Sequence, residues 1–364
     1  MTMERISAAD TSLSGGDPAT GEMVMRGHRL PDLIDRSYEE VVAILWDAEI
    51  PARMSLDALG AARCDAFARL SPRFAVMPSD LTVIELQRWL LASLPGAAMT
   101  PLLLVAGTAV AAASAIRLVR GQAPVAPDRS LPHAADLLRM IHGATPGETE
   151  TRMLDRYLVA MVDHGVNAST LTARVVASTG GGLSAAALAA LGALEGPLHG
   201  GAPGLVLDML DAIGKADHAE DWVVAALARG ERLMGFGSRA YHIRDPRADI
   251  MKDSVLALQR SGASWAPDGR LAFAETVERT VLSVMASRRP DRPLHTNVEF
   301  YAALLLEALG VPRAGFTPLF AASRAAGWAA HVREQERTGR MLRPTSRYVG
   351  PPPVDRPKTG KEQE

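Results

Sequence analysis

Residues 102–116 read LLLVAGTAVAAASAI and form the most apolar run of the chain. The run is shorter than the ~20 residues that a bilayer crossing needs, and Ala, Gly, Thr and Ser are scattered through it. Alanine is the strongest helix former, and its small side chain lets neighbouring helices approach closely. The run therefore predicts a buried core helix in a mainly helical protein.

The composition of the whole chain supports the same fold class. Of the 364 residues, 48% are hydrophobic but only 5% are aromatic, and alanine and leucine dominate the apolar set. This balance favours close-packed helices over sheets rich in branched and aromatic residues. Because the length exceeds the usual size of one hydrophobic core, we expect two domains, or one large domain that carries a smaller one.

Charge and cysteine content narrow the classes of partner. A formal net charge of −2 gives no electrostatic reason to expect binding to nucleic acid or to an acidic membrane, so we expect small-molecule partners. The single cysteine, Cys64, has no companion for an internal disulfide or a thiolate metal site, which suits a reducing compartment. Residues 1–10 carry charges and no apolar signal core, so we expect a cytoplasmic protein.

Helix signals recur along the chain, whereas residues 11–29, with their glycines and short apolar pieces, predict a small hairpin or an irregular arm. Ser169 or Thr170 is expected to cap the helix that follows it, and residues 350–364 are expected to form a mobile tail. Polar starts and apolar spacing predict helices at residues 37–45, 56–70, 80–94, 131–141, 148–163, 171–176, 183–194, 219–229, 251–261, 271–287, 299–309 and 316–331.

The stretch 235–247, GFGSRAYHIRDPR, combines two glycines with three arginines and an Asp-Pro turn. Glycine lets the backbone approach a ligand closely, and the arginine fork matches carboxylate or phosphate. The stretch is typical of an anion site in a loop. A solvated turn with scattered surface charge is the alternative at this point.

Four further residues are candidates for chemistry. His199 lies within the glycine-rich stretch 195–204, EGPLHGGAPG, where a ligand role is favoured over a core role. By itself, His164 is typical of a histidine at a helix C-terminus, and Glu299 is either a general base or, more simply, a charge favoured at a helix N-terminus. Arg324 stands among small apolar residues, which indicates a specific partner.

Taken together, the chain resembles the citrate synthase family from about Thr11 to Tyr348. The resemblance implies an all-α, two-domain fold with a small N-terminal β-hairpin, which works as a homodimer or a dimer of dimers. It also implies a small domain at 201–310 that closes over the active site and a large domain made of 1–200 and 311–364. The motifs that carry it are NAST at 167–170, GPLHGGA at 196–202, GFG at 235–237, DPR at 245–247, NVEF at 297–300, Arg324 with GW at 327–328, and RP at 343–344.

The family's reaction condenses acetyl-CoA, or propionyl-CoA, with oxaloacetate or a related 2-oxo acid, with no cofactor beyond the CoA thioester and no metal. Removing the weakly acidic thioester proton requires a carboxylate base and a donor to the developing enolate. By motif, Glu299 takes the place of the family's aspartate, and His199 is the enolate donor. Dicarboxylate binding maps to His164, Arg247 and Arg324, with Arg343 contributed across the subunit interface, and CoA binding maps to Leu198, Gly235, Phe236, Gly237 and Asn297.

The chain departs from the family at Ser238, which stands where the family has the histidine that polarises the ketone. Losing such a donor typically costs ~10²–10³ in rate. Ser238 is counted with the catalytic positions, and neither His242 nor His295 occupies a motif position that would replace the imidazole. The alternative function is therefore a catalytically impaired paralogue that binds CoA or a dicarboxylate in a regulatory or scaffolding role. A purely structural protein would leave the arginines and glycine loops unexplained.

Overall fold

The computed structural model describes residues 9–17, 19–47, 54–237, 243–288 and 294–351, and most of them are helical. Three short strands and three 3-10 turns complete the described elements. Their bounds are β1 (Ser14–Gly16), β2 (Met23–Met25), β3 (His28–Arg29), α1 (Leu30–Leu33), α2 (Tyr38–Trp46), α3 (Leu56–Phe74), α4 (Val83–Ala92), η1 (Gly96–Ala98), α5 (Pro101–Val119), α6 (His133–His142), α7 (Glu148–Met161), α8 (Ala168–Ser178), α9 (Gly182–Leu194), α10 (Ala202–Ile213), η2 (Ala216–His218), α11 (Ala219–Ala228), α12 (Pro246–Ser261), α13 (Arg270–Arg288), α14 (Val298–Ala308), η3 (Arg313–Gly315) and α15 (Phe316–Thr338).

The N-terminal strands form a small antiparallel sheet in the order β1-β2-β3. Met25 pairs with His28, so Arg26 and Gly27 make a two-residue turn. Both turn residues have positive φ, 48° and 82°, as the tight turn of a hairpin requires. Met23 and Met25 lie on the same face of β2, and both are buried against the helical body. The predicted hairpin is confirmed, with a third short strand added to it.

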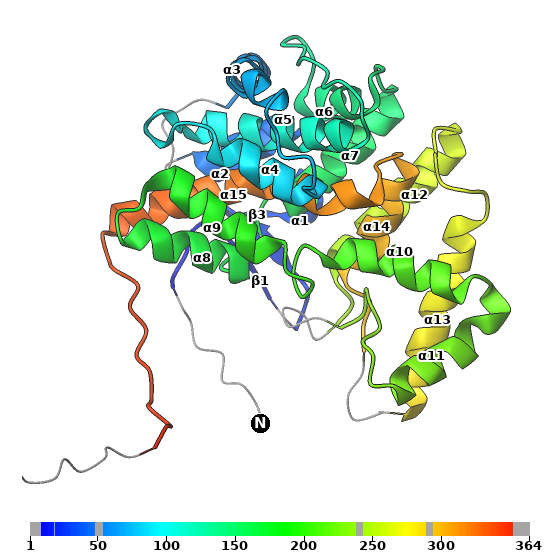
Figure 1. Ribbon diagram of the computed structural model, residues 1–364. Helices are drawn as coiled ribbons and strands as arrows, with labels where there is room; N and C mark the ends of the chain where they lie inside the picture. Colours follow the sequence, from blue (N-terminus) through cyan, green and yellow to red (C-terminus); the bar gives the residue numbers. More distant parts are fainter. Residues whose placement is uncertain (1–8, 18, 48–53, 238–242, 289–293, 352–364) are drawn as a thin grey trace, which may run out of the picture.

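Helices α5 and α15 form the centre of the core. Helix α15 packs against α5, α7, α8 and α9 and runs through the middle of the helical body, drawn in orange in Figure 1. Helix α5 is long and apolar enough to cross a membrane by length and composition, yet 78% of its apolar window is buried inside the protein. The prediction of a buried core helix at residues 102–116 is confirmed.

Helix caps explain where several helices begin. Ser37 accepts a hydrogen bond from the backbone N–H of Glu40, whose carboxylate in turn accepts from the Ser37 N–H at 2.9 Å, which is a capping box. Asn167 caps α8, because its side-chain oxygen accepts from the N–H of Thr170 at 3.2 Å. The expectation that Ser169 or Thr170 caps this helix was wrong. Asn167 takes the capping bond, and Ser169 lies inside the helix, where its hydroxyl donates to the Asn167 side-chain oxygen at 2.9 Å.

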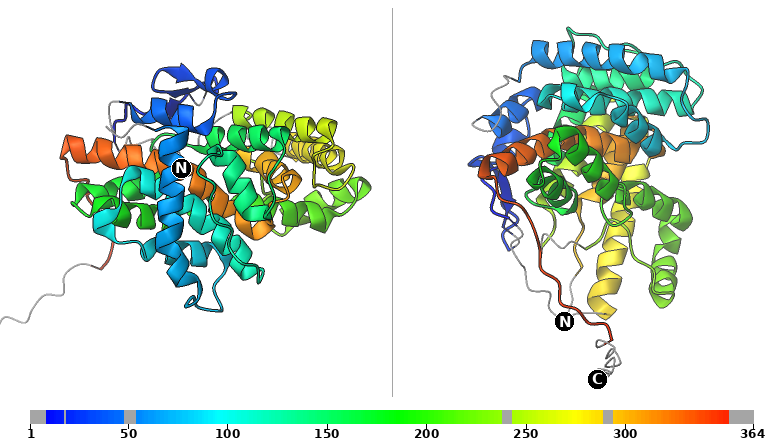
Figure 2. Two further views of the ribbon diagram at one scale, coloured as in Figure 1. Left: turned by 90° about the horizontal axis from the view of Figure 1, so that it is seen from above. Right: turned by 60° about the vertical axis from the view of Figure 1, so that its left-hand side comes forward.

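Helices α10 to α14 gather at one side of the molecule (Figure 1). Helix α11 lies beside α13, and α12 lies between α7 and α14 (Figures 1 and 2). Helix α10 was not expected, since its first turn contains Pro203 and Gly204. Proline is well tolerated there, because the N–H groups of the first turn have no partner inside the helix. Helix α12 likewise begins at Pro246, earlier than predicted.

Beyond α15 the described chain, residues 340–351, forms no helix and is almost entirely exposed. It extends away from the helical body, drawn in red in Figure 1. Its backbone is tied back where the Leu342 N–H donates to the Ser178 hydroxyl at 3.1 Å. Most of the predicted tail, residues 352–364, lies outside the described residues.

Candidate active site

Arg324 lies in the middle of α15 with 1% of its surface exposed. Its Nε donates to the carbonyl of Met161 at 2.7 Å, and its guanidinium carbon stands 4.9 Å from the centre of the Phe320 ring. Burial lowers the pKa of Arg324 to about 10, while Asp163 works in the opposite direction. The guanidinium therefore stays charged at neutral pH. A charge held this deep is typical of a site that pairs with an acid or binds an anion.

His199 lies in the loop between α9 and α10, close to the same arginine. The edge of Phe320 meets its ring with the ring centres 5.9 Å apart, and its Nε2 is 3.0 Å from the Ser169 hydroxyl. Trp328 Nε1 donates to that hydroxyl at 3.2 Å. Burial, and then the charge of Arg324, lowers the pKa of His199 to about 4. His199 is thus neutral at physiological pH and offers one ring N–H as a donor.

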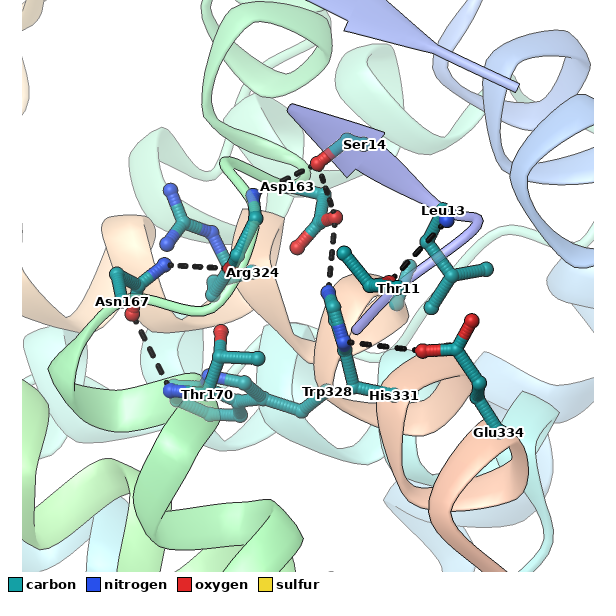
Figure 3. Close-up of polar contacts among 12 residues, drawn as sticks. Thr11, Leu13, Ser14, Asp163, Asn167, Thr170, Arg324, Trp328, His331 and Glu334 are labelled. Atoms are coloured by element: carbon teal, nitrogen blue, oxygen red, sulfur yellow. Dashed lines mark hydrogen bonds and ion pairs between the residues drawn. The ribbon is translucent and has the colours of Figure 1, made fainter. Parts of the chain in front are cut away.

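His164 lies in the loop that follows α7, and the N-terminal sheet holds this loop in place. The Ser14 hydroxyl accepts from the Gly165 N–H at 2.7 Å and donates to the Asp163 carboxylate at 2.6 Å (Figure 3). Burial, and then the charge of Arg247, lowers the pKa of His164 to about 3. His164 is therefore a second neutral imidazole in this region.

Asp163 is the end of a buried polar chain that the sequence analysis missed (Figure 3). His331 Nε2 lies 3.1 Å from Asp163. Arg174 Nη1 lies 3.1 Å from Nδ1, the other ring nitrogen of His331. Since arginine can only donate, His331 carries its proton on Nε2 and donates to Asp163. Burial alone would raise the pKa of Asp163, but His331, Arg324 and Ser14 together hold it below the usual value. The carboxylate is therefore ionised next to the site.

Arg247 and Asp245 form a buried pair at the start of α12. Asp245 caps the helix by accepting from the backbone N–H of Arg247 at 3.0 Å. The Nε and Nη2 of Arg247 donate to the two carboxylate oxygens of Asp245 at 3.0 and 2.7 Å. The two residues are 6% and 2% exposed. A bidentate pair of this kind fixes the plane in which the guanidinium lies.

Glu299 lies in the first turn of α14 and is half-buried. The cap residue Asn297 accepts from its backbone N–H at 3.1 Å. Burial raises the pKa of Glu299, Asp245 adds to the rise, and Arg247 and Arg324 oppose it. The carboxyl group therefore has a raised proton affinity within the field of both buried arginines.

The glycine loop at 235–237 lies against the start of α14. Gly237 N–H donates to the His295 carbonyl at 2.7 Å, and the side-chain amide of Asn297 donates to the Gly237 carbonyl at 2.9 Å. Gly235 has a φ of 83°, and a Cβ there would stand 2.7 Å from the Phe300 ring. Glycine is required at this position because the backbone crosses directly over the aromatic ring.

Electrostatic coupling shows which predicted residues lie together. Arg247 and Arg324 both act on His164 and on Glu299, and Arg324 acts on His199. These five residues come from five separate segments of the chain. Of the predicted CoA positions, Gly235, Phe236, Gly237 and Asn297 also lie together.

The remaining candidate residues are exposed, half-buried or outside the described residues. Leu198 is 71% exposed, and Arg343 lies in the exposed segment after α15. Ser238 and His242 are outside the described residues. His295 is half-buried and contributes its backbone carbonyl to the glycine loop. Within the described ranges, His, Cys, Asp and Glu side chains form no group of three that could hold a metal ion.

Asp163, Ser169, Asp245 and His331 were not assigned site roles from the sequence. Ser169 and Asp245 lie inside the motifs at 167–170 and 245–247, so the motifs mark them as candidates. His331 and Asp163 are far apart in sequence, and their contact depends on how α15 packs against α7. No local pattern indicates that contact.

The family model described as citrate synthase, C-terminal domain, matches residues 2–345. The chain belongs to the citrate synthase family. It is 35% identical to the citrate synthase of Haloferax volcanii over 97% of this chain and 96% of that protein. It is 44% identical to a Mycobacterium bovis relative of the citrate synthase 2 type, in an alignment that covers 63% of this chain and 60% of the length of that relative.

The solved structure of a family member agrees with the fold. The crystal structure of citrate synthase from Thermotoga maritima superposes with a TM-score of 0.82 at 29% identity. The superposition covers 98% of this chain and 97% of that chain. The predicted all-α fold of the citrate synthase family is confirmed.

Proposed function

We propose that this protein is a transferase that condenses acetyl-CoA with oxaloacetate, with propionyl-CoA and related 2-oxo acids as further substrates to be tested. The observation that supports this most is the convergence of Glu299, neutral His199 and the buried guanidiniums of Arg247 and Arg324. Membership of the citrate synthase family gives the same expectation independently.

Glu299 is the proposed general base. Its carboxylate takes a proton from the methyl carbon of the thioester, and the electrons of the broken C–H bond form an enolate. The enolate oxygen accepts a hydrogen bond from His199, which acts as a neutral donor. The Ser169 hydroxyl donates to Asn167 Oδ1 at 2.9 Å and lies 3.0 Å from His199 Nε2, so it helps to hold the His199 ring in place.

The enolate carbon then forms a bond with the ketone carbon of oxaloacetate. The electron pair of the C=O bond moves to oxygen, which takes up a proton from solvent and becomes a hydroxyl, while Glu299 releases the methyl proton to solvent. Water then cleaves the thioester and releases CoA and the tricarboxylate. Arg247, Arg324 and His164 are the proposed ligands of the dicarboxylate in this chain, and Arg343 of the partner subunit is the proposed fourth.

The proposal includes a domain arrangement and an assembly. Residues 201–310 act as the small domain that closes over the site, and residues 1–200 and 311–364 form the large domain. The CoA moiety lies along Leu198, the glycine loop 235–237 and Asn297. The protein works as a homodimer, because each site takes an arginine from the other subunit.

By the motif resemblance, Ser238 stands where the family has a histidine, just as Glu299 stands where the family has an aspartate. A serine hydroxyl donates one hydrogen bond, but it is shorter than an imidazole and carries no charge, so it polarises the ketone less strongly. This observation favours one alternative, a paralogue that binds CoA or a dicarboxylate without turning it over.

Release of the CoA thiol, measured with purified protein, tests both functions. Acetyl-CoA or propionyl-CoA is combined with a panel of 2-oxo acids, and a citrate synthase of known activity serves as the control. Turnover with at least one pair supports the proposal, and no turnover with any pair contradicts it. Calorimetric binding of oxaloacetate without turnover supports the alternative. Activity restored by Ser238→His then shows that the other site residues remain competent.

A further inference from the structure

Two loops that lead into proposed site residues are hydrogen-bonded to each other. The loop before α12 ends at Asp245 and leads to Arg247 in the first turn of α12, and the loop before α14 leads to Glu299. They are joined where the Asp245 N–H donates to the Thr296 carbonyl at 3.1 Å. A third element, α13, contributes Glu278 at the same place.

Glu278 is 7% exposed, and both of its carboxylate oxygens are used. Its Oε1 accepts from the Arg244 guanidinium and from the Thr296 hydroxyl. Its Oε2 accepts from the Tyr301 hydroxyl. These donors come from the loop before α12, the loop before α14, and α14 itself. One carboxylate therefore ties three segments together.

The charge of Glu278 matters for this contact. Burial alone would raise its pKa, but the donors Thr296, Tyr301 and Arg244 together hold it below the usual value. The carboxylate is thus ionised, and charge-assisted hydrogen bonds are stronger than neutral ones. Removing the charge weakens the bonds that Arg244 and two buried hydroxyls make to this carboxylate, although Arg244 keeps a second partner in Asp249 at 2.8 Å.

Each donor lies close in sequence to a proposed site residue. Arg244 directly precedes Asp245, which orients Arg247 through the bidentate pair. Tyr301 lies two residues after Glu299 in the same helical turn. A change at the Glu278 carboxylate can therefore reach Arg247 through one arm, Arg244, and Glu299 through a second arm, Thr296 and Tyr301.

We propose that Glu278 is a positioning residue that holds Arg247 and Glu299 in the relative positions that the condensation needs. The proposal rests on the proposed function of the site. Glu278 touches no reacting atom in it, and acts through Arg244 on one arm and through Thr296 and Tyr301 on the other. If Glu278 had a purely structural role, its loss would lower the stability of the protein but leave kcat, KM and oxaloacetate binding of the folded protein unchanged.

Glu278→Gln, with Glu275→Gln as its matched control, tests this. Glu275 lies on the same helix and is paired with Lys252 at 2.7 Å, but both side chains are about a third exposed. We expect Glu278→Gln to lower kcat about 10²-fold, the usual effect of a misplaced catalytic group. The control should stay within about twofold of wild type, because exposed ion pairs contribute little.

The two arms are separated by Arg244→Met and Tyr301→Phe. Arg244→Met should weaken calorimetric binding of oxaloacetate about tenfold more than it changes kcat, because its arm leads to Arg247. Tyr301→Phe should lower kcat with little change in oxaloacetate binding, because its arm leads to Glu299. Circular dichroism and the melting temperature identify which variants are folded.

The outcomes separate this inference from the proposed function. If the wild type binds oxaloacetate but turns over nothing, the proposed function fails, and the Arg244 arm is still tested by binding. If folded Glu278→Gln matches Glu275→Gln in kcat, KM and binding, the positioning role is overturned. If Glu278→Gln does not fold, the split between Arg244→Met and Tyr301→Phe supports the role, and equal effects of the two overturn it.

Discussion

At the scale of single residues, burial shifts the pKa of the Glu299 carboxyl and the pKa values of the two site histidines in opposite directions. It raises the pKa of the Glu299 carboxyl, because the charged form is the one that loses hydration. It lowers the pKa of His199 to about 4 and that of His164 to about 3 for the same reason. One physical cause thus produces a stronger base and two neutral imidazoles.

Replacing Glu299 by Gln removes the proposed base while it keeps the size of the side chain. We expect kcat to fall about 10²–10⁴-fold, the usual contribution of general base catalysis. Oxaloacetate binding should change little, because the arginines remain. Steady-state kinetics and calorimetry measure the two effects. A variant that keeps wild-type kcat would remove Glu299 from the mechanism.

The depressed pKa of His199 also predicts a dependence of stability on pH. The unfolded histidine titrates near 6.5 and the folded one near 4, so between these values the unfolded chain binds the extra proton. This linkage makes the free energy of unfolding fall as the pH drops from 6.5 to about 4. Asp155, with a raised pKa of about 7, makes stability change with pH in the opposite direction, but it is present in wild type and in any His199 variant alike.

The test compares wild type with His199→Gln across this pH range. The stability of the variant should fall less steeply than that of wild type, because glutamine does not titrate. Chemical denaturation at each pH gives the two curves. Parallel curves would mean that His199 has an ordinary pKa in the folded protein.

At the scale of elements, one glycine decides how closely α15 approaches the end of α7. A Cβ at Gly327 would stand 2.5 Å from the Val162 carbonyl and 2.8 Å from the Asp163 carboxylate. Both neighbours are fixed, one as backbone and the other by its buried hydrogen bonds. The close approach is therefore possible only with glycine, although alanine is the better helix former.

Gly327→Ala should lower the free energy of unfolding by about 1–3 kcal/mol through overpacking. The matched control is Gly204→Ala in α10, where the nearest atom to a new Cβ is 3.7 Å away. It should raise stability by about 0.4–1 kcal/mol, because it reduces the freedom of the unfolded chain. Urea denaturation measures both. Equal and favourable effects would contradict the packing argument.

Local patterns located most helices but not all of their ends. The capping box at Ser37 is readable because both partners lie within one turn. The cap of α8 was assigned to the wrong residue, since Asn167, Ser169 and Thr170 are all good cap residues. The Ser169 hydroxyl does not cap the helix, because it donates to Asn167 and also contacts His199 and Trp328 from distant segments.

At the scale of the whole molecule, the proposed dimer predicts complementation between inactive chains. Arg343→Gln should inactivate the site of the neighbouring subunit, and Glu299→Gln should inactivate its own. Refolding the two variants together should restore roughly a quarter of wild-type activity, because half of the dimers are mixed and each has one intact site. Thiol release measures the recovery. No recovery from a mixture of confirmed mixed dimers would place Arg343 in its own subunit's site, and an active Arg343→Gln variant would place it outside both sites.

The sequence by itself determined the helical fold class, the N-terminal hairpin and the family. It did so because helix periodicity, turn residues and short motifs are local properties of the chain. It also named five residues that the tertiary structure brings together: His164, His199, Arg247, Glu299 and Arg324.

Only the tertiary structure decided the protonation states and the supporting contacts of these residues. Burial and the fields of distant charges shift the pKa values, and both depend on packing between segments far apart in the chain. The same holds for the contact of Asp163 with His331 and for the carboxylate of Glu278 among its three donors. Such contacts leave no periodic signal in sequence, because each partner is placed by a different helix.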